Sequence, residues 1–390
     1  MDKNKVSILL LLDLSAAFDT IDHSILLSRL ETVFGIRSTA LSWFRSYLQD
    51  RSQTVSVGNH SSTPFPLQFG VPQGSVLGPI LFILYTTPLS SVITNHSINH
   101  QLFADDTQLQ NSSSPASTST LTCNLQTCTT DIKEWMNENQ LKLNDEKTEA
   151  MLFSPPNLPP SFQLPSEITI GSHQIPFSEQ ARDLGFIFDS NLSMEKHITK
   201  ICQTAYFELK RISTIRKHLT QDAVKLLVTS CVLSRLDYCN SLLMGLDNTN
   251  KSAIKPMQKV QNSAARLVLG ANRRQPCTPL LKSLHWLPIA QRIQYKVGCL
   301  CFNIISGSAP SYLSDILPLH EFTPYSQKLR SFSDSRKFQE NKYNRKKHGF
   351  RSFSVYGPHF WNSLPYSVRN SKDINSFKTC LKTHLFKQSF

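Results

Sequence analysis

Two absences narrow the class of protein. The nine cysteines form no Cys-x-x-Cys pair and no spacing typical of a zinc knuckle, so we expect reduced, mostly buried thiols. The apolar run of residues 6–12 stops at Asp13, which makes it too short for a membrane span and short for a signal-peptide core. A buried strand explains the run better. We therefore expect an intracellular protein of the nucleus or cytoplasm, neither secreted nor bound to a membrane.

Acidic residues are scarce in the second half of the 390-residue chain. Residues 1–195 hold 10 Lys and Arg against 19 Asp and Glu, a net charge of −9, whereas residues 196–390 hold 31 against 9, a net charge of +22. Lys and Arg gain affinity for nucleic acids by displacing counterions from phosphates. A solvated basic surface is the alternative, but +22 is more than solubility requires. The second half is therefore predicted to bind nucleic acid.

Carboxylates in the first half have the layout of a two-metal site. Asp105 and Asp106 are adjacent and flanked by strand-like residues, and Asp13 ends the apolar run. A site for two hard cations such as Mg²⁺ needs converging carboxylates on rigid elements. An Asp-Asp pair by itself would also suit a turn. The block GVPQGSVLGP at residues 70–79, whose glycines and prolines fix a special backbone path, favours the site.

At these residues the chain resembles the reverse transcriptases of LINE-type (non-LTR) retrotransposons, in the Jockey-like and chicken-repeat-like branch. Residues 13–19 (DLSAAFD) resemble the first catalytic motif of that family, residues 70–82 its template and nucleotide motif, and residues 103–106 (FADD) its paired-aspartate motif. The resemblance covers nearly the whole chain. It extends to the next palm motif at 141–149, the primer-grip region at 183–185, and the stretches 283–288 (SLHWLP) and 356–362 (YGPHFWN).

The resemblance implies an α+β fold, with a polymerase palm made of a small antiparallel sheet and packed helices, then a mostly helical thumb and a basic C-terminal module. The expected domains are a palm at 1–153, a linker with the primer grip at 154–192, a thumb at 193–275 and a basic region at 276–390. Local patterns predict helices capped by Asp22 and by Ser38, strands at 53–58 and 64–69, a hairpin around the paired aspartates, a loop or flexible insert at 111–120, and a helix at 121–136.

The same resemblance implies an RNA-directed DNA polymerase. Asp13 and Asp105 would hold two Mg²⁺ ions, which Mn²⁺ can replace, with Asp106 supporting the site and the Leu14 carbonyl as an extra metal ligand. The partners would be an RNA template, a DNA primer and deoxynucleoside triphosphates, with no membrane.

Four further residues receive roles from the resemblance. Phe18 would be the steric gate that excludes a 2′-hydroxyl, although it could equally be plain core. Gln73 and Gly74 would contact nucleotide and template. Lys147 would protonate the leaving pyrophosphate, although a surface lysine close to Asp145 is unremarkable.

A basic stripe is expected in the second half. Lys251, Lys255, Lys259 and Arg266 share roughly one face of a predicted helix and could follow a phosphate backbone, although any solvated helix has such a face.

The sequence also departs from the family. Only twelve residues precede Asp13, whereas the family has a fingers region there, so we expect an N-terminally truncated protein with weak or no activity on its own. Two function classes stay open: a reverse transcriptase fragment, and a non-catalytic nucleic-acid-binding remnant. A two-metal nuclease is a distant third, because residues 70–79 have no obvious use in one.

Overall fold

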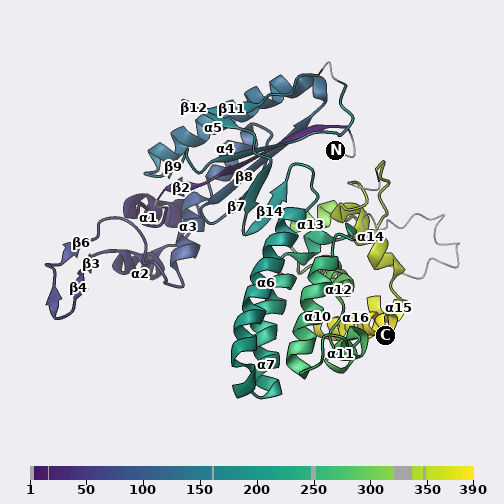
Figure 1. Cartoon of the computed structure of the whole chain (residues 1–390). Coiled ribbons are helices and arrows are strands. Elements are labelled where there is room, and N and C mark those ends of the chain that lie inside the picture. The colour runs from purple at the N-terminus through teal and green to yellow at the C-terminus, as the bar shows by residue number, and fades with distance from the viewer. Residues whose placement is uncertain (1–3, 16, 160–161, 247–251, 320–335, 346–347) are drawn as a thin grey trace. The chain divides into compact units, whose positions relative to one another are not determined.

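The structure is a computed structural model that describes residues 4–15, 17–159, 162–246, 252–319, 336–345 and 348–390 (Figure 1). The chain divides into two compact units, and the division falls between Asp183 and Leu184. The first unit is mixed α and β, and the second is almost entirely helical. The predicted α+β class is therefore confirmed.

The first unit is built on a four-stranded antiparallel sheet in the order β10-β1-β8-β7. Its central strand β1 (Val6–Leu12) is the predicted apolar run, and β7 (Asn99–Phe103) and β8 (Asp106–Ser113) form the predicted hairpin. The edge strand β10 (Glu149–Phe153) pairs with the other side of β1. The central strand therefore lies between the two segments that carry the later motifs.

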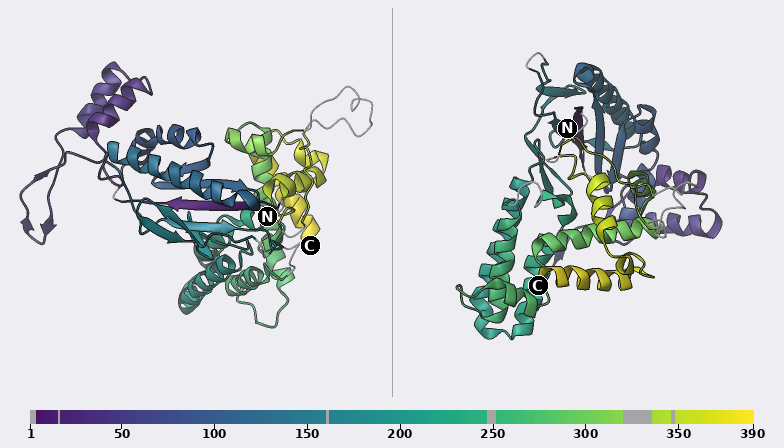
Figure 2. Two further views of the ribbon diagram at one scale, coloured as in Figure 1. Left: turned by 90° about the horizontal axis from the view of Figure 1, so that it is seen from above. Right: turned by 90° about the vertical axis from the view of Figure 1, so that its right-hand side faces the viewer.

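Helices cover one face of this sheet. Burial alternates along β1, with Val6, Ile8, Leu10 and Leu12 fully buried, as expected for a strand with one face on a core. The helices α4 (Leu89–Asn95) and α5 (Thr118–Glu138) lie along that face in all views (Figures 1 and 2). Odd-numbered residues of β1 consequently face away from α5.

The segment between β1 and β7 contains four helices, α4 among them, and an extended arm of short strands. Helix α1 (His23–Thr32) has the predicted Asp22 cap, whose carboxylate accepts hydrogen bonds from the amides of Ser24 and Ile25. The cap predicted at Ser38 is wrong, because Arg37 precedes α2 (Ser38–Leu48) and makes no side-chain cap. The other elements are β3 (Ser52–Gln53), which pairs with β6 (Phe65–Pro66), β4 (Ser56–Val57), which pairs with β5 (His60–Ser61), and α3 (Gly78–Thr86).

The loop predicted at residues 111–120 is wrong. Strand β8 continues to Ser113 because its whole length pairs with β1, and a short 3₁₀ turn η1 (Pro115–Ser117) leads directly into α5. Pairing with a buried strand thus overrides the Ser/Thr composition. The remaining strands of the unit are β2 (Leu14–Ser15) paired with β9 (Lys142–Leu143), β11 (Glu167–Ile170) paired with β12 (His173–Pro176), and β13 (Gln180–Asp183).

The second unit is a set of packed helices around one hydrophobic core. This core includes buried residues from Phe186 to Leu385. After a short strand β14 (Phe186–Asp189) the elements are α6 (Glu195–Ile215), η2 (Arg216–His218), α7 (Gln221–Val228), the π-helical turn η3 (Thr229–Leu233), α8 (Ser234–Asp237), η4 (Asn240–Leu243), α10 (Lys255–Leu269), α11 (Cys277–Ser283), α12 (Ile289–Ile305), α13 (Ser311–Ile316), α14 (Phe353–Ser363), α15 (Tyr366–Arg369) and α16 (Ile374–Ser389).

All nine cysteines are free, as predicted. The expectation that most are buried is wrong, because only Cys128, Cys202 and Cys301 are buried and Cys123 and Cys380 are exposed. Within the described ranges, no helix is long and apolar enough to cross a membrane.

Candidate active site

Strand register brings two of the three aspartates to one face of the sheet. In the β1–β8 pair, Leu12 lies opposite Thr107 and Leu11 opposite Gln108. One further step along this register sets Asp13 opposite Asp106. Directly opposed residues in an antiparallel pair have their side chains on the same face, roughly 5 Å apart. Asp13 and Asp106 therefore lie side by side on the face of the sheet that turns away from α5.

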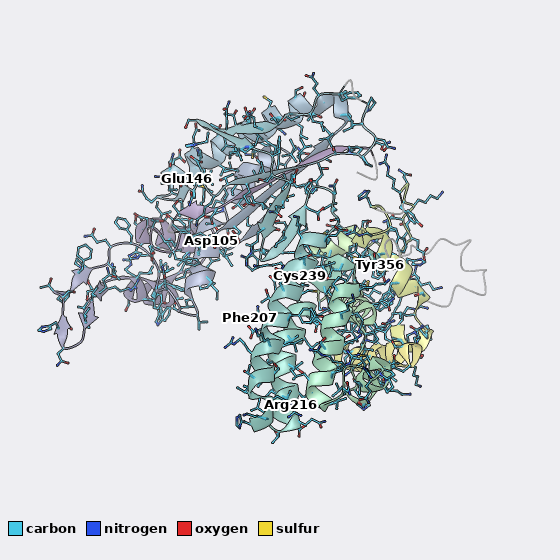
Figure 3. The ribbon with its side chains drawn as sticks, viewed as in Figure 1. Asp105, Glu146, Phe207, Arg216, Cys239 and Tyr356 are labelled. Carbon is cyan, nitrogen blue, oxygen red and sulfur yellow. The ribbon has the colours of Figure 1, made fainter. Side chains whose placement is uncertain are left out.

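The third aspartate lies in the hairpin turn. Phe103 pairs with Asp106, so the turn consists of Ala104 and Asp105, with Asp105 labelled in Figure 3. Ala104 has a φ of 52°, in the left-handed region that a residue with a side chain rarely adopts. Such strain is typical of turns that position functional side chains. The turn thus holds the paired aspartates in a fixed relation to each other.

A pocket of about 390 Å³ opens at this end of the sheet. Asp13 and Asp106 line it, whereas Asp105 does not. The lining contains acidic and basic residues that sequence reasoning did not assign to the site. The complete lining is Leu11, Leu12, Asp13, Asp106, Glu146, Lys147, Glu149 and Arg182.

Glu149 reaches the pocket through the second neighbour of β1. It pairs with Leu11 in the β1–β10 register, which gives it the same face as Asp13. Its Oε2 is buried and has no hydrogen-bond partner among the described residues. Glu149 follows Lys147 and Thr148 in the predicted palm motif, and this position is the sequence feature that could have assigned it to the site. Arg182 carried no comparable signal.

The raised pKa values of two aspartates show that several carboxylates lie close together. Burial, together with the charges of Asp105 and Asp13, raises the pKa of Asp106. Burial, with the charge of Asp106, also raises the pKa of Asp183, the last residue of β13. The Asp183 carboxylate accepts a hydrogen bond from Gln108 Nε2 at 2.7 Å. Four carboxylates of the first unit therefore share one electrostatic environment, which a bound cation would relieve.

Lys147 contacts one of these carboxylates directly. Its Nζ lies 3.0 Å from Asp13 Oδ2, while the lysine side chain is 67% exposed and that of Asp13 is 23% exposed. Asp13 Oδ2 is buried and, among the described residues, receives no hydrogen bond of good geometry. The pair leaves a buried, under-coordinated oxygen at the pocket wall.

The Gly70 backbone packs tightly against the segment that follows Asp13. Gly70 has a φ of 82°, and a Cβ built on it would lie 2.9 Å from both Asp19 Cα and Asp19 O. Its amide donates to Ile21 O, and the next amide, of Val71, donates to Phe18 O. Only glycine fits this approach. The motif of residues 70–82 is therefore locked to the first catalytic motif.

Two residues that were predicted to contact the nucleotide, Phe18 and Gln73, lie beside this contact. The Phe18 ring is half-buried and lies 4.9 Å from the Phe82 ring, between centroids. Gln73 Nε2 donates to both carboxylate oxygens of Asp19 at 2.9 Å, a positioning contact that sequence reasoning missed. Gly74, with a φ of 77°, has open space around its Cα.

The predicted basic stripe of the second unit is only partly visible. Lys251 lies outside the described residues. Lys255 and Lys259 of α10 are exposed. Arg266 is half-buried, donates to Gln275 O at 3.2 Å, and lines a pocket of about 770 Å³ together with Arg216 and other residues of α6 and α10.

The donor set offers carboxylate oxygens, which are the ligands that a hard divalent cation prefers. Two of these oxygens, on Asp13 and Glu149, are buried and accept no hydrogen bond among the described residues, although that of Asp13 forms an ion pair with Lys147. Over the described parts of the chain, no group of three or more His, Cys, Asp or Glu is arranged around a common metal position. The side chains therefore offer the donor type and the charge that a divalent metal needs. Too few of them converge on one point to complete its coordination.

Comparison with known proteins identifies relatives of this chain. Residues 1–188 match the model of the family described as reverse transcriptase (RNA-dependent DNA polymerase). The chain is 28% identical over 270 residues to a probable RNA-directed DNA polymerase from transposon BS of Drosophila melanogaster, and 28% identical over 219 residues to the RNA-directed DNA polymerase from mobile element jockey of the same species. These alignments cover 66% and 55% of this chain.

The alignments span 28% and 23% of those two relatives, so this chain represents about a quarter of their length. Among solved structures, a telomerase from Candida albicans aligns over 79% of this chain and 48% of its own, with 11% identity and a TM-score of 0.33. A similarity that weak supports no argument about the fold.

Proposed function

We propose that this chain carries the catalytic centre of an RNA-directed DNA polymerase. Its match to the reverse transcriptase family over residues 1–188 and its relatives from the BS, jockey and X elements support a reverse transcriptase of the non-LTR, LINE type. The single observation that most supports this catalytic centre is the opposition of Asp13 and Asp106 across β1 and β8, at the wall of an open pocket. The proposed reaction transfers a nucleotide to the 3′-hydroxyl of a DNA primer on an RNA template.

Asp13, Asp105 and Asp106 would hold two Mg²⁺ ions, with the Leu14 carbonyl as a further ligand. Bound divalent cations would activate the primer hydroxyl and neutralise the charge that develops on the triphosphate. The raised pKa of Asp106 and the buried Asp13 Oδ2, which accepts no hydrogen bond among the described residues, both fit a site that is completed by cations. Glu149 and Asp183 would add to the negative potential without needing to be ligands.

The other residues would position the substrates. Lys147, paired with Asp13 at the pocket rim, would meet the triphosphate and could supply a proton to the leaving pyrophosphate. Gln73, held by Asp19, would contact nucleotide and template beside Gly74. Phe18 would lie under the sugar and exclude ribonucleotides, because its ring is fixed against Phe82.

Primer extension tests the proposal. The full chain is supplied with a DNA primer on an RNA template, deoxynucleotides and Mg²⁺. Asp106→Asn should reduce extension by roughly a hundredfold or more, because it removes a charge that the site needs for cation binding. Glu138→Gln, an exposed residue at the end of α5, is the matched control and should extend like the wild type.

Two outcomes separate the alternatives. Equal extension by wild type and Asp106→Asn would assign the activity to a contaminant. Nucleic-acid binding without any extension would favour the non-catalytic remnant, which the net charge of +22 over residues 196–390 supports independently. Phe18→Ala should admit ribonucleotides if Phe18 is the gate, whereas a purely structural Phe18 would change stability alone.

A further inference from the structure

The segment SLHWLP at residues 283–288 has no part in the proposed polymerase site. It joins α11 to α12 in the second unit, and its backbone is sharply turned at His285, whose φ is 55°. The Trp286 amide donates to Leu281 O at 3.0 Å. This turn leaves His285 exposed and Trp286 only 7% exposed. The turn thus fixes an exposed aromatic residue, His285, next to a buried one, Trp286.

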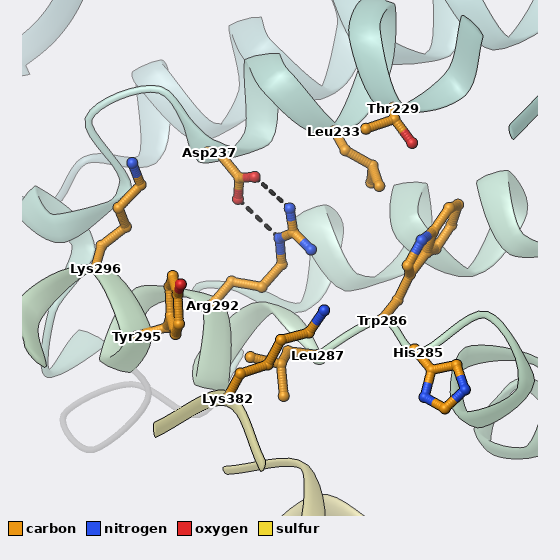
Figure 4. Close-up of a pocket in the computed structure, with 10 residues that line it drawn as sticks. All are labelled: Thr229, Leu233, Asp237, His285, Trp286, Leu287, Arg292, Tyr295, Lys296 and Lys382. Carbon is orange, nitrogen blue, oxygen red and sulfur yellow. Dashed lines mark hydrogen bonds and ion pairs between the residues drawn. The ribbon is translucent and has the colours of Figure 1, made fainter. Parts of the chain in front are cut away.

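They line a pocket of about 280 Å³, drawn in Figure 4. This volume is near the lower end of that of small-molecule sites, about 300 Å³. Buried Leu233, Trp286 and Leu287 contribute an apolar wall. The complete lining is Thr229, Leu233, Asp237, His285, Trp286, Leu287, Arg292, Tyr295, Lys296 and Lys382.

An ion pair closes one side of the pocket. Arg292 donates through Nε to Asp237 Oδ1 at 2.8 Å, and through Nη2 to Asp237 Oδ2. The third nitrogen, Nη1, takes no part in the pair and points away from Asp237 (Figure 4). A half-buried guanidinium is thereby held rigidly with donors to spare.

The charge of the pocket is positive. Asp237 is its single carboxylate and is matched by Arg292, so the exposed Lys296 of α12 and Lys382 of α16 give a net charge of about +2. Burial raises the pKa of Tyr295 to about 12, so its hydroxyl adds no negative charge near neutral pH. The pocket therefore combines an apolar, aromatic wall with cations at its rim.

We propose that this pocket binds one unpaired nucleotide of a single-stranded nucleic acid, with the base against Leu233, Trp286 and Leu287 and different phosphates of the strand at Lys296 and at Lys382, which lie on different sides of the pocket (Figure 4). A base in a duplex has both faces covered, so only a single strand can supply it. Arg292 Nη1 would donate to an acceptor on the base. The inference rests on the proposed function only in taking nucleic acid as the partner.

Binding of a labelled single-stranded hexanucleotide to the full chain, followed by fluorescence anisotropy, tests the inference. The double variant Lys296→Gln/Lys382→Gln should weaken binding by at least about tenfold and lower the slope of log affinity against log salt by about 1.4, for two phosphate contacts on a single strand. The matched control Lys378→Gln/Lys387→Gln removes the same charge from exposed positions of α16 outside the pocket. It should change affinity by no more than about twofold.

The aromatic wall is tested separately. Trp286→Leu should weaken binding roughly tenfold, since it removes the aromatic side chain on which the base stacks. Trp286→Phe retains a ring and should keep most of the affinity. Thermal unfolding of both variants shows whether each one folds. If Trp286→Leu does not fold, the lysine variants alone decide the test.

Three results would overturn the inference: equal losses in the two double-lysine variants, equally tight binding of a duplex through the same residues, or uridine monophosphate or inorganic phosphate binding as tightly as the hexanucleotide. Oligo-dT and oligo-U distinguish DNA from RNA as the source of the nucleotide. Hexanucleotide binding requires no primer extension, so a failure of the proposed polymerase activity is distinguishable from a failure of the pocket.

Discussion

In the first unit the candidate site residues come from adjacent strands, whereas in the second unit they come from helices and a loop far apart in the sequence. Asp13, Asp106 and Glu149 share a face because β8 and β10 both pair with β1. Lys296 and Lys382 line one pocket only because α12 packs on α16. Register therefore fixes the first site residue by residue, while the second depends on the packing of an entire helical core.

The charge of the two units differs in the same direction. Residues 1–183 hold 10 Lys and Arg against 17 Asp and Glu, and residues 184–390 hold 31 against 11. An acidic unit repels a phosphate backbone unless cations are bound, and a basic unit attracts it over a Debye length of about 8–10 Å. We therefore expect that mutations can change catalysis and nucleic-acid affinity separately.

The largest expected effect concerns the core of the second unit. Trp361 is fully buried against Phe338 and Phe377, and its indole N–H donates to Arg336 O. Trp361→Ala should lower the free energy of unfolding of this unit by about 3–5 kcal/mol. Hydrogen exchange should show lost protection in peptides from 184–390, with 3–183 unchanged. An equal loss of protection in both units would show that the two units do not unfold independently.

A smaller effect is expected at the backbone contact of the first unit. Gly70→Ala should cost roughly 3 kcal/mol in urea unfolding, because the new Cβ meets Asp19 backbone atoms at 2.9 Å and the left-handed φ is strained as well. Gly58→Ala has a similar φ but nothing within 4 Å, so it should cost about 1 kcal/mol. If both variants lose a similar free energy of unfolding, the backbone strain at positive φ accounts for the loss and the close approach to Asp19 does not contribute.

The smallest of these stability effects depends on pH. His197 of α6 is 2% exposed, stacks on Phe186, and burial lowers its pKa to about 4. The unfolded chain, with an ordinary histidine pKa of about 6.5, then binds more protons than the folded one, so stability falls as pH falls from 6.5 toward 4. We expect a loss of about 2 kcal/mol by pH 5.

His197→Phe provides the control for this prediction. Phenylalanine can stack on Phe186 without titrating, so the difference in unfolding free energy between pH 7 and pH 5 should shrink by the same amount. An unchanged pH dependence in His197→Phe would assign the titration to other groups.

The parts of the first unit that the sequence predicts are those encoded locally. Asp13, Asp105 and Asp106 stand in short motifs next to strand-like runs, and the Asp22 cap needs only its own helix. Glu149 and Arg182 join the pocket through strand pairing and packing beyond β1, which a single sequence does not specify. The extension of β8 through residues 111–113 was missed for the same reason, since its polar composition indicates a loop and only the pairing with β1 makes it a strand.

In the second unit helical spacing predicts the helix that the structure shows as α10, but not which of its faces contacts other helices. The stripe predicted from Lys255, Lys259 and Arg266 treats one helix in isolation, whereas packing half-buries Arg266 and gives it a carbonyl partner. The pocket around Trp286 draws on residues from 229 to 382, a separation that no local pattern encodes. The role of the stripe in nucleic-acid binding stays a prediction.

The central claim is that the carboxylates set side by side by β1 and β8 bind a divalent cation. Titration calorimetry of the full chain with Mn²⁺ tests it without any need for polymerase activity. We expect binding by the wild type and by Glu138→Gln, and at least tenfold weaker binding by Asp13→Asn and by Asp106→Asn, since each loses a charged ligand. Equal Mn²⁺ affinity in all four proteins would contradict it.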